Sequence, residues 1–171
     1  MIERAWFQEF RALRDVSLGL TPLTVLVGPN GSGKTSVLEG IHDVLQVASV
    51  PVHVALNGPR RPDRLRNTRA TGPMRVGLGF AGGASRSLEL EVVPYGADEV
   101  HGEEEAPYRA TMRGRDAEAA AEWNAKVQTL RDAGPAFEGL RQEVVGAALL
   151  RLSPRALAAP HYAEEQEPRI A

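Results

Sequence analysis

Eight residues near the N-terminus, positions 28–35, constrain this chain more than any other stretch. They read Gly-Pro-Asn-Gly-Ser-Gly-Lys-Thr and fit the phosphate-binding pattern G-x-x-x-x-G-K-[ST] without a mismatch. The apolar, β-branched run at residues 23–27 predicts a buried strand before the loop. Apolar residues at helical spacing predict a helix at 34–47 after it. Since a strand, a glycine loop and a helix in this order are the context the pattern needs, the sequence predicts an α/β fold that binds phosphate.

The residue types of the loop indicate how it would hold a nucleotide. Glycines allow successive backbone N–H groups to turn toward one phosphate, and the start of the helix adds further unpaired N–H groups. Lys34, one of the chain's two lysines, supplies a compact charge to the β- and γ-phosphates, and the Thr35 hydroxyl is placed to ligate Mg²⁺. The predicted cofactor-binding residues of the loop are Asn30, Gly31, Ser32, Gly33, Lys34, Thr35 and Ser36.

Length and composition set the class of protein. A chain of 171 residues with a 43% hydrophobic share is one domain or part of a larger one. A net charge of −2 argues against a protein that coats nucleic acid through general basicity. The chain has no cysteine, and no apolar run approaches the roughly 20 residues of a membrane helix. We therefore expect a cytoplasmic protein that does not enter a membrane.

The chain is predicted to form one domain, residues 1–171, in three regions. Residues 1–49 hold two strands, the loop and its helix; residues 50–115 hold a basic loop and a β-rich lobe; residues 116–171 hold helices, a strand and a tail. Besides residues 23–27, the predicted strands are residues 2–7, 16–20, 75–80, 87–93, 108–112 and 147–152. Helices are predicted at 116–132, with Asp116 near the N-cap, and at 136–143.

Two segments carry concentrated charge. Residues 57–73 mix arginines with glycine and proline, which predicts a basic loop or a short irregular helix. This loop could contact DNA phosphates, and a plain solvated loop is the alternative. An acidic loop at 94–107 is interpreted as solvated surface.

Three features of the first 45 residues resemble the ATPase heads of SMC, RecF and OLD proteins, a branch of the ABC-type ATPases. They are the pair Phe10-Arg11 between the opening strands, the loop variant itself, and the helix start Ser-Val-Leu-Glu-Gly-Ile at 36–41. The resemblance implies a P-loop NTPase fold of the ABC/SMC-head type, an N-terminal lobe with an antiparallel β subdomain followed by helices. It also implies that ATP and Mg²⁺ bind and that Arg11 approaches the nucleotide, although Arg11 could equally be a solvated turn residue. Trp6, Phe7 and Phe10 are interpreted as core residues, with stacking on adenine as the alternative.

Parts of such a head are missing from the sequence. The resemblance calls for an Asp-Glu pair after an apolar strand, a signature loop and a switch histidine. The one Asp-Glu pair, Asp98-Glu99, follows no apolar strand, so the catalytic residues are unknown. We expect an incomplete head whose catalytic half lies beyond Ala171 or on another polypeptide.

The resemblance therefore suggests ATP binding with Mg²⁺ as part of an SMC/RecF/OLD-like ATPase, acting in DNA repair or defence against invading DNA. Hydrolysis would need the missing half or a second head in a dimer, and DNA is a possible partner. Two alternatives remain: a stand-alone P-loop kinase for a small molecule, and a nucleotide-sensing module that does not hydrolyse ATP. Phosphate transfer by the chain alone would favour the kinase, and nucleotide-dependent partner binding without phosphate release would favour the sensor.

Overall fold

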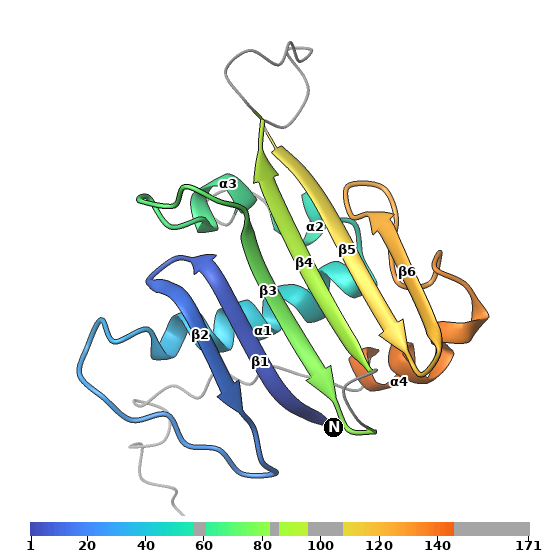
Figure 1. Cartoon of the computed structure of the whole chain (residues 1–171), viewed down its shortest axis with the longest axis horizontal. Helices are drawn as coiled ribbons and strands as arrows, with labels where there is room; N and C mark the ends of the chain where they lie inside the picture. Colours follow the sequence, from blue (N-terminus) through green and yellow to red (C-terminus); the bar gives the residue numbers. More distant parts are fainter. Residues whose placement is uncertain (57–60, 83–85, 96–107, 146–171) are drawn as a thin grey trace, which may run out of the picture.

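A computed structural model describes residues 1–56, 61–82, 86–95 and 108–145. Its centre is one antiparallel sheet of six strands in the order β2-β1-β3-β4-β5-β6 (Figure 1). The strands are β1 (Ile2–Phe10), β2 (Leu13–Gly19), β3 (Met74–Phe80), β4 (Ser87–Pro94), β5 (Tyr108–Asp116) and β6 (Ala119–Asn124). The helices of the described residues are α1 (Lys34–Ser49), α2 (Val52–Ala55), α3 (Pro62–Leu65) and α4 (Glu138–Val145), with a 3₁₀ helix, η2 (Pro135–Phe137), before α4. The predicted α/β class and antiparallel lobe are confirmed.

The hydrophobic core lies between one face of the sheet and α1. Alternate residues of the central strands point to this face, so that Val76 pairs with Leu90 and Leu90 with Met112 across β3, β4 and β5. All three are at most 1% exposed. Burying a side chain of this size contributes about 1.5–3 kcal/mol. The alternation of the predicted strands therefore decides which face of the sheet is inside.

Helix α1 crosses behind the sheet in Figure 1 and buries one stripe against it. Val37, Val44 and Val47 recur at helical spacing and are 0–5% exposed. Gly40 marks the closest approach to β1, because a Cβ there would lie 2.7 Å from the Phe7 ring and 3.1 Å from the Phe10 ring. The predicted helix at 34–47 is confirmed, and its glycine lets it lie close to the end of β1.

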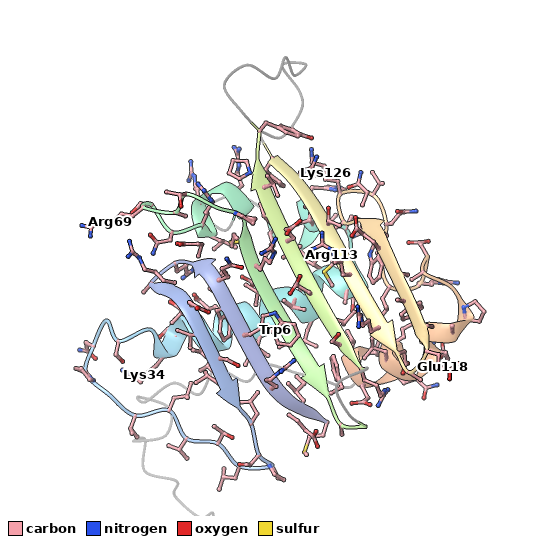
Figure 2. The ribbon with its side chains drawn as sticks, viewed as in Figure 1. Trp6, Lys34, Arg69, Arg113, Glu118 and Lys126 are labelled. Carbon is pink, nitrogen blue, oxygen red and sulfur yellow. The ribbon has the colours of Figure 1, made fainter. Side chains whose placement is uncertain are left out.

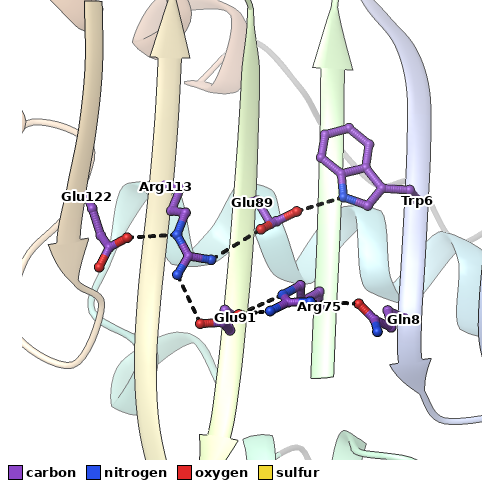
Figure 3. A network of polar contacts seen from close by, with 7 residues as sticks. All are labelled: Trp6, Gln8, Arg75, Glu89, Glu91, Arg113 and Glu122. Carbon is purple, nitrogen blue, oxygen red and sulfur yellow. Dashed lines mark hydrogen bonds and ion pairs between the residues drawn. The ribbon is translucent and has the colours of Figure 1, made fainter. Parts of the chain in front are cut away.

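The opposite face of the sheet, which none of the described helices covers, carries a network of polar side chains that we call the charged face (Figures 2 and 3). Arg75 Nε and Arg113 Nη2 donate to the two oxygens of Glu91 at 2.6 and 3.0 Å. Trp6 Nε1 donates to Glu89 Oε2 at 2.9 Å. The seven residues of the charged face are Trp6, Gln8, Arg75, Glu89, Glu91, Arg113 and Glu122.

Glu91 is the most buried member of the charged face, at 8% exposure. Burial by itself would raise the pKa of its carboxyl group. Hydrogen bonds from Arg113 and Arg75 outweigh this, so the pKa of Glu91 lies below its usual value. The same contact raises the pKa of Arg113. The pairs therefore keep a buried carboxylate charged.

The predicted helix at 116–132 is wrong, because residues 119–124 form strand β6. Ala117, at φ 53°, turns the chain back, and β6 pairs with β5 from Asp116 opposite Ala119 onward. Trp123 is buried beside Phe137, with ring centroids 6.5 Å apart. The alanines of this segment favour a helix, but the free edge of β5 and the burial of Trp123 override that local preference.

Asp116, predicted as an N-cap, instead joins the β5–β6 hairpin to α4. Its Oδ2 accepts a hydrogen bond from the backbone N–H of Leu140 at 3.1 Å, and its Oδ1 accepts one from Arg86 Nε at 2.9 Å. Arg86 Nη1 also donates to Glu143 of α4 at 2.6 Å. The predicted helix at 136–143 is confirmed by η2 and α4. The predicted strand at 147–152 and the acidic residues at 98–105 lie outside the described residues.

Candidate phosphate-binding site

The glycine loop connects the end of the apolar run to the first turn of α1. Gly31 and Gly33 have φ values of 82° and 91°, which side chains other than glycine rarely adopt. A Cβ on Gly33 would also lie 2.8 Å from Leu13 Cδ2 of β2. The loop therefore needs glycine at position 33 both for its backbone angle and for its contact with the sheet.

Lys34, the first residue of α1, folds back onto the loop. Its Nζ donates to the carbonyl oxygens of Gly28 at 2.8 Å and Pro29 at 2.7 Å, and lies 3.3 Å from Ser32 Oγ. An ammonium held only by neutral oxygens can exchange them for a phosphate oxygen, which forms the stronger, charge-assisted bond. The loop thus holds the Lys34 ammonium at the start of α1 in a form that can bind an anion.

Arg11 reaches the same place from the turn between β1 and β2. Its backbone lies in the left-handed region at φ 49°. The turn is held by a 2.7 Å hydrogen bond from Arg11 N to the Leu65 carbonyl and a 2.6 Å bond from Asn67 Nδ2 to the Arg11 carbonyl. The guanidinium forms an ion pair with Glu39 of α1. Arg11 is therefore held at the site by its backbone and by its side chain.

These elements enclose a hollow of about 420 Å³, within the range of small-molecule sites. It is lined by Arg11, Ala12, Asn30, Gly31, Gly33, Lys34, Thr35 and Ser36. Of the predicted site residues Ser32 alone is absent from the lining, and its hydroxyl contacts Lys34 instead. The sequence reasoning missed Ala12 and Glu39. Ala12 is next to Arg11 in the sequence, and Glu39 belongs to the helix start at 36–41 that carries the resemblance, but neither residue was assigned a role in the site.

The predicted strand at residues 23–27 is wrong for the described structure. This run, which we call the apolar segment, forms an irregular loop beyond β2 (Figure 1). Leu23, Val25 and Val27 are 82%, 72% and 85% exposed, and Leu26 alone packs partly on the core. A strand requires a neighbouring strand to pair its backbone groups, and the described sheet supplies none at this position.

None of the remaining candidates that the structure describes lines the hollow. Phe7 and Phe10 are buried in the core, as predicted. The core interpretation is wrong for Trp6, which is partly exposed and lies on the charged face, where its Nε1 donates to Glu89 (Figure 2). In the basic loop, Arg66 donates to the carbonyls of Ala70 and Gly72 and so holds the loop itself. Arg64 and Arg69 are exposed, and Arg60 lies outside the described residues.

No group of three or more His, Asp or Glu side chains in the described part of the chain is arranged to hold a metal ion. Among the described helices, none is long and apolar enough to cross a membrane.

A glycine loop ahead of a helix, held against an antiparallel lobe, defines a domain of the P-loop ATPase class. Residues 23–144 match the family model described as "AAA domain, putative AbiEii toxin, Type IV TA system". The match covers well over half of the chain, and the chain belongs to this family.

Individual relatives match over shorter stretches. An OLD nuclease from Thermus scotoductus is 51% identical over 45 residues, which are 26% of this chain and 8% of that protein. The DNA replication and repair protein RecF from Acinetobacter baumannii is 42% identical over 57 residues, 33% of this chain and 16% of that protein. The matches thus span a small part of either relative. The relationship to OLD and RecF proteins expected from the loop and its flanks is confirmed.

A solved structure from work on ATP-driven dimerization and DNA-stimulated activation of SMC ATPases also resembles this chain. It aligns over 91% of this chain and 94% of its own, with 16% identity and a TM-score of 0.39. A likeness this distant carries no functional argument.

Proposed function

We propose that this chain binds ATP with Mg²⁺ as part of an SMC/RecF/OLD-like ATPase. One observation carries the proposal: the glycine loop, the first turn of α1 and the Arg11 turn meet at one hollow of about 420 Å³. Two cations and the N-terminus of a long helix face that hollow. This combination suits a polyphosphate, since both charge and backbone N–H groups stabilise phosphate oxygens.

Each residue of the hollow has a role in this proposal. The N–H groups of residues 30–35 surround the phosphates, Lys34 exchanges its loop carbonyls for β- and γ-phosphate oxygens, and Arg11 binds a phosphate from the opposite side. The Thr35 hydroxyl fits Mg²⁺, which commonly takes one or two protein ligands and completes its octahedron with phosphate oxygens and water. Bound Mg²⁺ would neutralise phosphate charge there.

We further propose that hydrolysis requires a second polypeptide element, either a further segment of the head or a second head. The apolar segment supports this proposal. Its alternating side chains are up to 85% exposed, whereas apolar runs of this kind are typical of strands buried in a sheet. A strand added beside it would cover these side chains next to the phosphates. We also propose that the chain acts on DNA, in repair or in defence against invading DNA, because it is related to an OLD nuclease and to the DNA replication and repair protein RecF.

The two lysines provide a matched test of ATP binding. Lys34→Ala removes a charge-assisted contact worth roughly 1.5–3 kcal/mol, so the Kd for Mg-ATP should rise about tenfold or more in isothermal titration calorimetry. Lys126→Ala is the control, because Lys126 lies over the rings of Tyr95 and Tyr108, away from the hollow. Equal Mg-ATP affinity in the two variants would contradict the proposal.

Two further measurements test Mg²⁺ binding and ATP hydrolysis. Thr35→Val should reduce the gain in ATP affinity that Mg²⁺ provides, while Thr35→Ser, which keeps the hydroxyl, should retain it. Phosphate release from Mg-ATP by this chain alone should stay at background. Steady turnover without a partner would contradict the need for a second element, and phosphate transfer to a metabolite would favour the kinase alternative.

A further inference from the structure

Arg11 and Glu39 form an ion pair at the edge of the hollow that the roles above leave unexplained. Arg11 lines the hollow, whereas Glu39 does not. The Arg11 side chain is 32% exposed and that of Glu39 is 13% exposed. A nearly buried carboxylate beside a phosphate site would repel the ligand unless a cation neutralised it. The Arg11–Glu39 ion pair therefore affects the charge at the phosphate site as well as the stability of the fold.

The backbone under Arg11 is fixed independently of Glu39. The hydrogen bonds with Leu65 and Asn67 hold the turn, and Phe10, the preceding residue, is fully buried in the core. The Arg11 guanidinium lies 5.8 Å from the centre of the Phe10 ring. These contacts do not fix the direction of the Arg11 side chain beyond the Phe10 ring.

Glu39 is brought to the guanidinium by the close packing of α1. The next residue, Gly40, lies against the rings of Phe7 and Phe10, where any side chain would collide. This contact presses the α1 turn that carries Glu39 against the end of β1. The helix that begins with the phosphate loop thus also supplies the carboxylate that meets Arg11.

We infer that Glu39 is a positioning residue, which holds the Arg11 guanidinium at the edge of the hollow so that its remaining donors face a bound phosphate. A guanidinium has five N–H donors and can bind a carboxylate along one edge and a phosphate along another. Glu39 acts through Arg11 and does not touch the nucleotide. The inference rests on the proposed function, because the ligand of Arg11 is the phosphate of the nucleotide bound by the loop.

The test is a double-mutant cycle on Mg-ATP affinity, using the full chain with Arg11→Ala, Glu39→Gln and both changes together. We expect Arg11→Ala to raise the Kd roughly tenfold and Glu39→Gln to raise it about threefold to tenfold. The double variant should bind no more weakly than Arg11→Ala, because without Arg11 the Glu39 carboxylate has no guanidinium to position and can only repel the phosphate. Arg14→Ala, an exposed arginine of β2 outside the lining, is the control and should bind like the wild type.

Thermal melting of the same proteins separates positioning from a purely structural tie. A structural tie would lower Tm in Glu39→Gln and leave the affinity of the folded protein unchanged, which would overturn the inference. Additive losses in the double variant, or tighter binding by Glu39→Gln, would overturn it as well. If Glu39→Gln does not fold, the cycle is run with Glu39→Asp, which keeps the charge on a shorter side chain and must show the same non-additivity.

The Lys34→Ala comparison keeps this inference distinct from the proposed function. If Lys34→Ala weakens Mg-ATP binding but the Arg11 and Glu39 substitutions show no coupling, only the positioning role of Glu39 is contradicted. If the wild type binds Mg-ATP no more tightly than Lys34→Ala does, the proposed function is contradicted, and the inference fails with it.

Discussion

The charged face contains a buried carboxylate, whereas the apolar segment consists largely of exposed side chains. Glu91, a carboxylate on the outer surface of a sheet, is 8% exposed, whereas Val27, a β-branched apolar residue, is 85% exposed. The carboxylate has two arginine partners on the neighbouring strands β3 and β5. The valine has no neighbouring strand in the described sheet.

The difference shows that burial follows the available partners more closely than the polarity of a side chain. Each strand of the charged face lies about 4.8 Å from the next, so opposite charges meet without help from another layer. The apolar segment can be covered only by a strand or a layer that comes from elsewhere. The charged face is therefore complete within this chain, and the apolar segment is the surface on which a partner element is proposed to bind.

Among substitutions in these two regions, the largest predicted effect on stability comes from Gly77 of β3, on the charged face. A Cβ at this position would lie 2.0 Å from the Trp6 ring, so Gly77→Ala must displace the ring and break its bond to Glu89. We expect a loss of about 1–3 kcal/mol in the free energy of unfolding, measured with urea. Gly79→Ala is the matched control, because its Cβ would come no closer than 3.4 Å to Arg4. Equal losses at the two positions would rule out this account of Trp6.

A smaller effect is expected when the buried carboxylate is neutralised. The pKa of Glu91 is lowered in the folded state, so its ion pairs stabilise the protein above the unfolded value near 4.5 and cease to do so as the pH falls through the lower folded value. Glu91→Gln should cost about 1 kcal/mol at pH 7, since the partner arginines are partly exposed and screened.

Urea titrations from pH 7 down to pH 3 test this pH dependence. The difference between Glu91→Gln and the wild type should shrink below about pH 4.5. Glu118→Gln, an exposed residue outside the network, should match the wild type throughout. A difference that is constant with pH would show that charge plays no part at Glu91.

The smallest effect is expected on the apolar segment. Val25→Lys should change the free energy of unfolding by less than about 0.5 kcal/mol, because Val25 is 72% exposed. The same change at Val76, which is 1% exposed, should abolish folding. If the segment docks a partner strand, Val25→Lys should also prevent that assembly while Mg-ATP binding by the isolated chain persists. A large loss of stability in Val25→Lys would show that the segment is already buried in solution.

Local information in the sequence determined the phosphate loop, the helix that follows it and the alternating strands. The glycines of the loop need particular φ values, and the valines of α1 and the leucines of β4 repeat with the period of their own element, so neighbours along the chain were enough. The relationship to OLD and RecF proteins was readable for the same reason, since it lies in contiguous residues.

Contacts between distant segments decided the rest. Residues 119–124 form a strand because β5 offers an edge for pairing and Phe137 covers Trp123. A local pattern of alanines contains no information about either contact. Residues 23–27 are unpaired in the described sheet because a strand forms only beside a neighbour, which local sequence does not supply. The meeting of Arg11 with Glu39 depends on Gly40 letting α1 approach β1. Local propensity is worth fractions of a kcal/mol per residue, whereas pairing and burial contribute more per side chain, so the tertiary structure prevailed wherever the two disagreed.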